Sequence, residues 1–61
     1  MKIIKKDNYN RDHISESVIA ENVHPYFARD IAEFLNQKMR NDDSFFCKVE
    51  ADDYVPYQFE P

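Results

Sequence analysis

The side chains best suited to chemistry in this chain are His13, His24 and a single cysteine, Cys47. A thiol next to a histidine can act as a nucleophile with its base, and the same residue types bind zinc. None of the three lies at the spacing of about two to four residues that is typical of zinc motifs. Cys47 also falls in a stretch with strand-like alternation, where a thiol is usually buried and inert. We therefore expect no catalytic residue, no metal site and a reduced, structural thiol.

Paired acids occur at Asp42-Asp43 and Asp52-Asp53, a pattern that also occurs in hydrolases and calcium loops. An EF-hand calcium loop needs a glycine at a fixed position, and this chain contains none. The absence of glycine equally excludes the glycine-rich loops that bind nucleotide phosphates. The acid pairs are therefore expected in solvated turns, and we expect no cofactor.

The amino-terminal residues Lys2, Lys5 and Lys6 are candidates for phosphate contacts. Three lysines in a chain of net charge −4 make a weak basic footprint, which argues against nucleic-acid binding. No apolar stretch follows these lysines as it would in a signal peptide, and no run approaches the roughly 18 apolar residues of a membrane span. A lone cysteine suits a reducing compartment, so the sequence predicts a cytoplasmic protein without a membrane contact.

The elements that must position these residues belong to one small domain, residues 1–61. Domains of this size bury only about 60% of their unfolded surface and are marginally stable. Without glycine, turns depend on asparagine and aspartate, which tolerate positive φ better than other residues. Such residues cluster at 7–10, 41–43 and 52–53, which divides the chain into four parts.

The clearest element is a helix expected from Pro25 to about Arg40. Proline fits the first helical position, and Asn22 or His24 would cap the helix. Apolar residues recur at spacings of three and four, which predicts one amphipathic stripe: Phe27, Ala28, Ile31, Phe34, Leu35 and Met39. We expect Ile31 or Leu35 to be buried near the centre of this stripe.

Strands are expected at 2–5 and at 45–50, where Phe45, Cys47 and Val49 on one face alternate with Phe46, Lys48 and Glu50 on the other. The alternation resumes at 54–59 after the Asp52-Asp53 turn, so residues 45–59 are predicted to form a hairpin whose last strand, with Pro56, lies at a sheet edge. The pattern of residues 13–23 slightly favours a strand, and a helix is the alternative for this stretch. The predicted fold is α+β: one long amphipathic helix on a small, mostly antiparallel sheet, in the order β-β-α-β-β.

The carboxyl-terminal third concentrates the acidity of the chain. Residues 41–61 contain six acidic residues against one lysine, mixed with aromatic residues. Aromatic side chains supply contact area and carboxylates supply steering toward a basic surface; the competing interpretation is that the acids are solvated turns and the aromatics are core. The candidate partner-binding residues are Phe46, Glu50, Asp52, Asp53, Tyr54, Tyr57 and Phe59.

These observations predict a small intracellular binding protein of the regulator or inhibitor type, whose partner is a protein with a basic surface. Short acidic chains of this kind are typical of accessory proteins of viruses and mobile elements. A homo-oligomeric structural protein is the first alternative, because small domains with surplus aromatic residues often bury them in a two-fold dimer. An enzyme or metal protein is a distant alternative.

Overall fold

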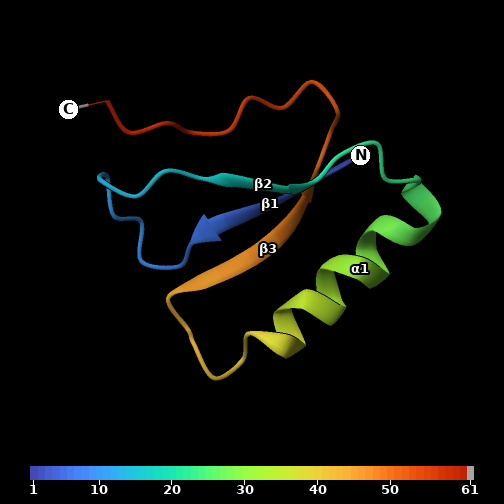
Figure 1. Cartoon of the computed structure of the whole chain (residues 1–61), viewed down its shortest axis with the longest axis horizontal. Helices are drawn as coiled ribbons and strands as arrows, with labels where there is room; N and C mark the ends of the chain where they lie inside the picture. The colour runs from blue at the N-terminus through green and yellow to red at the C-terminus, as the bar shows by residue number, and fades with distance from the viewer. Residues whose placement is uncertain (61) are drawn as a thin grey trace.

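The computed structural model describes residues 1–60 as an α+β fold (Figure 1). The elements are β1 (Lys2–Asp7), β2 (Ser17–Ala20), α1 (Pro25–Lys38) and β3 (Phe45–Glu50). Within these residues the three strands form one antiparallel sheet in the order β2-β1-β3. The predicted α+β class is confirmed, and the ambiguous stretch 13–23 contains a strand. Pro61 lies outside the described residues.

Both faces of the sheet are covered at the central strand β1, where the adjacent residues Ile3 and Ile4 are both buried. Ile3 pairs with Val49 and Lys5 pairs with Cys47 across β1 and β3, and facing residues share one side of an antiparallel pair. Ile3 and Ile4 therefore point to opposite faces, and both side chains are 0% exposed. Helix α1 covers the Ile3 face, since Cys47 is buried there while Lys48 on the other face is exposed.

The opposite face is covered by Tyr54. Lys2, Ile4 and Lys6 follow one another along this side of β1. Lys2 Nζ donates to the Tyr54 carbonyl at 3.3 Å, and Lys6 Nζ donates to the Tyr54 hydroxyl at 3.1 Å. Tyr54 is thus held by its backbone at Lys2 and by its hydroxyl at Lys6, on the side of β1 where Ile4 is buried without a helix.

Helix α1 forms because its ends are well specified. Pro25 opens the helix, and the Nδ1 of His24 accepts the Tyr26 N–H at 3.0 Å, which confirms one of the two predicted caps. Lys38 lies in the last turn, where the helix dipole favours a cation. The helix spans 14 residues and ends at Lys38, slightly before the predicted end.

The buried face of α1 differs from the predicted stripe. Ala28 and Ala32 are buried against the sheet, and Leu35 is half-buried. We expected Ile31 or Leu35 to be buried near the centre of the stripe, but Ile31 is 38% exposed and Leu35 is only half-buried, so neither residue is fully buried. Two alanines let the helix backbone approach β3 closely, and this rotates the larger residues on the neighbouring rows of the stripe toward solvent.

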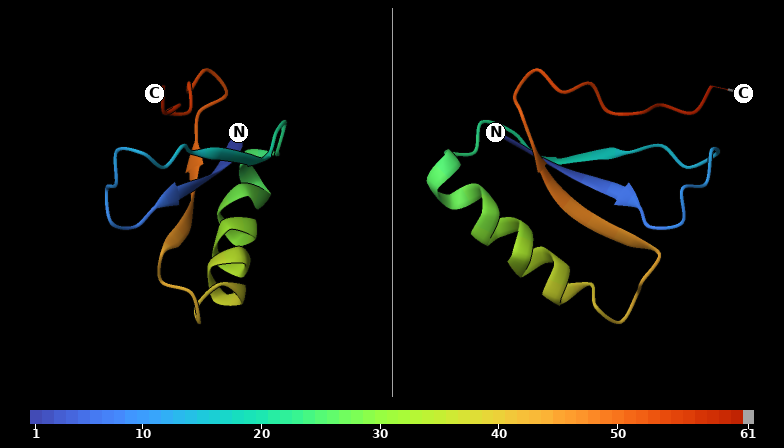
Figure 2. Two further views of the ribbon diagram at one scale, coloured as in Figure 1. Left: turned by 60° about the vertical axis from the view of Figure 1, so that its left-hand side comes forward. Right: turned by 180° about the vertical axis from the view of Figure 1, so that it is seen from behind.

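The expected fourth strand and hairpin over 45–59 are not formed. The outer edge of β3 is already occupied: Asn36 Oδ1 accepts the Cys47 N–H at 2.7 Å and Asn36 Nδ2 donates to the Cys47 carbonyl at 3.0 Å. A returning strand would need those same backbone groups. The C-terminal segment (residues 51–60) instead crosses to the far edge of the sheet and runs beside β2 and the residues that precede it (Figure 2).

Asparagine does replace glycine at the tight turns. Asn10 and Asn22 adopt positive φ, at 54° and 56°, a conformation that asparagine reaches at lower cost than most residues. Turns also occur at Asp52 and Asp53 and between α1 and β3. The three predicted turn clusters are therefore confirmed, whereas the turn at Asn22 was not predicted.

Candidate functional site

The seven predicted partner-binding residues do not lie on one surface. Glu50 and Tyr54 are turned inward toward Lys6, and Phe46 is half-buried on β3. Asp52 and Asp53 are exposed in the turn after β3, where the Asp52 carboxylate lies 2.8 Å from the Met1 amino group. Tyr57 and Phe59 lie on the C-terminal segment, against residues that precede β2.

Lys6 is the centre of a cluster that holds the C-terminal segment on the sheet. Its Nζ lies 2.6 Å from a Glu50 oxygen and 3.9 Å from a Glu16 oxygen. The Tyr54 hydroxyl donates to Glu16 and accepts from Lys6. Burial lowers the pKa of Lys6, but its hydrogen bonds and the two carboxylates raise the pKa more, so Lys6 stays charged. Glu50 and Tyr54 are therefore tied up inside the molecule.

Tyr57 belongs to a second arrangement, in which backbone and side chain both bind the loop before β2. Glu16 N–H donates to the Tyr57 carbonyl at 2.9 Å, and Tyr57 N–H donates to Glu16 Oε1 at 3.0 Å. The Tyr57 hydroxyl donates to the Asp12 carbonyl at 2.5 Å. Phe59 follows the same course, since its N–H donates to Ser15 Oγ at 2.9 Å.

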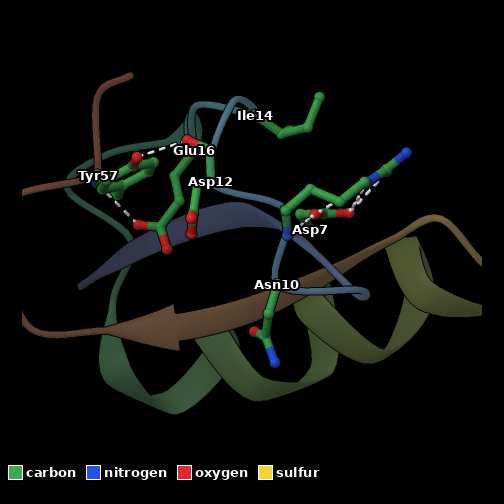
Figure 3. A pocket seen from close by; sticks show the side chains of 7 residues that line it. Asp7, Asn10, Asp12, Ile14, Glu16 and Tyr57 are labelled. Carbon is green, nitrogen blue, oxygen red and sulfur yellow. Dashed lines mark hydrogen bonds and ion pairs between the residues drawn. The ribbon is translucent and has the colours of Figure 1, made fainter. Parts of the chain in front are cut away.

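This contact borders an open hollow of about 230 Å³ between the C-terminal segment and the loop that connects β1 to β2 (Figure 3). Figure 3 shows the side chains of Asp12 and Glu16 extending in the same direction, with the Tyr57 ring held against Glu16. We call this site the acidic hollow, and its lining residues are Asp7, Asn10, Arg11, Asp12, Ile14, Glu16 and Tyr57.

The carboxylates of the acidic hollow differ in their partners. Asp7 is neutralised by Arg11, whose Nη2 lies 2.7 Å away; this hydrogen-bonded pairing lowers the pKa of Asp7 far below its ordinary value. Burial raises the pKa of Glu16, but hydrogen bonds from Tyr54 and Tyr57 and the charge of Lys6 lower it more, so Glu16 is ionised near neutral pH. The Asp12 carboxylate has no hydrogen bond or ion pair within residues 1–60.

The lining of the acidic hollow suits a long basic side chain. The Tyr57 ring offers apolar surface for the methylene stem of a lysine or arginine, which such side chains bury readily. Asp12 and Glu16 offer carboxylate oxygens for its charged end. Asp12, Ile14 and Glu16 were absent from the predicted site, and no local pattern could have indicated them, because Glu16 and Tyr57 are 41 positions apart in the chain.

The thiol and one of the two histidines take structural positions. Cys47 is buried beneath α1, and burial raises the pKa of its thiol. His24 caps α1, and His13 is exposed in the loop before β2. Among residues 1–60, no group of three or more histidine, cysteine or acidic side chains is placed to hold a metal ion.

Comparison of the chain with protein family models, with curated proteins and with solved structures finds no match. In the part of the chain that the structure describes, no helix combines the length and the apolar character needed to cross a membrane.

Proposed function

We propose that this protein is a small protein-binding module of the regulator or inhibitor type, which acts by occupying the basic surface of a protein partner. The observation that supports the proposal most directly is the Asp12 carboxylate, which lines the acidic hollow without a partner of its own. A charged group left unpaired beside an aromatic ring and a second carboxylate is a good receptor for a cation.

The contact surface that we propose combines this acidic hollow with the exposed part of the C-terminal segment. A lysine or arginine of the partner enters the hollow between Asp12 and Glu16, with its stem along Tyr57. Phe59, two residues after Tyr57, is 42% exposed and adds contact area, and the exposed Asp53 at the start of the segment adds long-range attraction. No residue of this surface is assigned a catalytic or cofactor-binding role.

The proposal is tested by titrating the ¹⁵N-labelled protein with a short lysine-rich peptide and recording amide chemical shifts. We expect shifts at Asp12, Glu16 and Tyr57 that weaken with added salt, because exposed charges are screened within about 10 Å at 0.1 M salt. The Asp12→Asn variant should abolish most of the response, with Glu21→Gln, which removes an equal charge at an exposed position after β2, as the control. Equal shifts in both variants would contradict the assignment of the site.

Capture from a source lysate then identifies the partner, with the Asp12→Asn protein as the matched bait. Once a partner is known, Asp52→Asn together with Asp53→Asn should slow association and flatten its salt dependence, since these carboxylates act at long range. Tyr57→Ala should mainly speed dissociation, by an amount worth roughly 1–3 kcal/mol if the ring is an anchor. A partner captured equally well by the Asp12→Asn bait would not be using the acidic hollow.

A further inference from the structure

Helix α1 presents a band of large apolar side chains to solvent. Tyr26 is 77% exposed, Phe27 54% and Phe34 64%, and Ile31 lies between the two phenylalanines in the helical projection. The Tyr26 and Phe27 rings pack edge to face, with centroids 5.0 Å apart. We call these four residues the apolar helix face. Helix α1 itself lies on the opposite side of the sheet from the C-terminal segment (Figures 1 and 2).

We propose that the apolar helix face is the interface of a two-fold dimer, covered by the same helix of a second copy running antiparallel. The charges along the face are arranged for self-association. Asp30 lies one turn before Phe34 and Lys38 lies one turn after it, on the same row of the helix. A two-fold axis at Phe34 places Asp30 of each copy against Lys38 of the other, because the axis pairs positions equally far before and after Phe34.

The ion pairs within helix α1 leave Asp30 and Lys38 available for this arrangement. On the outer side of α1, Arg29 already pairs with Glu33 at 3.3 Å. Asp30 and Lys38 take part in no ion pair within residues 1–60. Asp30 and Lys38, which flank the apolar helix face, are therefore free to make two reciprocal ion pairs with a second copy. A different protein would need a cation and an anion placed at the matching positions to make the same two pairs.

The shape of the face supports the same axis. A hollow of about 450 Å³ lies at the carboxyl-terminal end of α1, lined by Phe34, Gln37, Lys38 and Arg40. Phe27 precedes Phe34 by about 10 Å along the helix axis, and the lining of the hollow runs from Phe34 itself to Arg40, six positions later. The two-fold axis consequently places Phe27 of each copy at the far end of the other copy's hollow, next to Arg40, while the two Phe34 rings meet at the centre.

The available area predicts a weak, reversible dimer. Aromatic side chains bury about 150–250 Å² each, so the exposed parts of the four residues amount to roughly 400 Å² of apolar surface per copy. Stable interfaces bury about 800 Å² per partner, and the polar flanks of α1 supply only part of the remainder. Because the acidic hollow stays outside this interface, the dimer would present two copies of it to one partner, which raises avidity without new contacts.

Sedimentation velocity over about a hundredfold range of protein concentration tests the proposal, because dimerisation follows mass action. We expect the wild-type mass to rise from monomer toward dimer. Phe34→Asp should stay monomeric across the range and keep its fold, since the side chain is largely exposed. Val55→Asp, a charge placed at an exposed position of the C-terminal segment, should behave as wild type.

A charge exchange distinguishes the two-fold antiparallel pairing from general stickiness. Asp30→Lys alone and Lys38→Asp alone should each weaken the dimer by about tenfold, because each change replaces two attractions with two repulsions. The double exchange should restore the wild-type dissociation constant. A wild-type protein that stays monomeric, or a double exchange as weak as the single variants, would overturn the proposal. Neither outcome affects the peptide titration at the acidic hollow, because its residues lie outside α1.

Discussion

The edge of β3 offers the sharpest test of how this fold is held together. Asn36 binds both the N–H and the carbonyl of Cys47, at 2.7 and 3.0 Å, and so takes the place of a neighbouring strand. We predict that Asn36→Ala is among the most destabilising exchanges of a polar residue in the chain. It removes two hydrogen bonds and leaves two backbone groups unpaired beneath α1.

The expected magnitude follows from these contacts. A hydrogen bond contributes about 1 kcal/mol net, and an unsatisfied buried group costs about 1–3 kcal/mol. Alanine has a higher helix propensity than asparagine, which offsets up to about 0.7 kcal/mol of this cost. The free energy of unfolding should therefore fall by about 2–3 kcal/mol. At roughly 0.05–0.15 kcal/mol per residue, the whole domain is stable by only about 3–9 kcal/mol. Such a loss should lower the melting temperature by about 8 °C or more.

Thermal unfolding followed by circular dichroism measures this loss, with Gln37→Ala as the control, because Gln37 is exposed on the next helix position. Asn36→Asp adds a second readout. Its carboxylate keeps an acceptor for the Cys47 N–H but places a negative oxygen against the Cys47 carbonyl, which raises the pKa of the new carboxyl above its unfolded value. The penalty should therefore be small below the unfolded pKa, near 4, and grow as pH rises through the folded pKa.

Equal melting temperatures for Asn36→Ala and Gln37→Ala would refute the edge assignment. The same conclusion would follow if hydrogen exchange showed the Cys47 amide to be as unprotected in the native protein as an exposed loop amide, because a hydrogen-bonded edge should open only with local or global unfolding. Asn36→Ala should also aggregate more readily than the control, since it bares an unpaired strand edge.

Two further predictions concern single side chains. Cys47 should react with a thiol reagent only as fast as the fold opens, because it is buried and its pKa is raised by burial; fast labelling of the folded protein at neutral pH would contradict this. The paired Asp7, whose pKa is lowered by Arg11, should stabilise the protein above its unfolded pKa near 3.8, with that stability lost as pH falls toward the folded pKa. Asp7→Asn should flatten the dependence of stability on pH in that acidic range, and an unchanged acid unfolding curve would show that the pair does not contribute.

The local elements of this protein could be predicted from its sequence because short-range patterns determine them. Pro25, the spacing of apolar residues and the terminal Lys38 specify α1, and alternation specifies β3 and the burial of Cys47. Asparagine and aspartate mark the turns because no glycine is present. These features depend on neighbours within a few positions in the chain, and the structure agrees with them.

The side of α1 that faces the sheet and the path of the C-terminal segment were decided only in three dimensions. The apolar stripe was wide enough for several orientations, and close approach at Ala28 and Ala32 selected the one that leaves Phe27 and Phe34 exposed. Asn36 then occupied the edge of β3 that a hairpin would have needed.

The acidic hollow is likewise a product of tertiary structure. With the β3 edge closed, the C-terminal segment crosses the sheet and meets the loop before β2, which joins Tyr57 to Asp12 and Glu16. The composition of the sequence indicated an acidic, aromatic surface in the last third of the chain. Which carboxylates stay free and which are neutralised depends on Lys6 and Arg11, and on contacts between residues far apart in the sequence that no local pattern encodes.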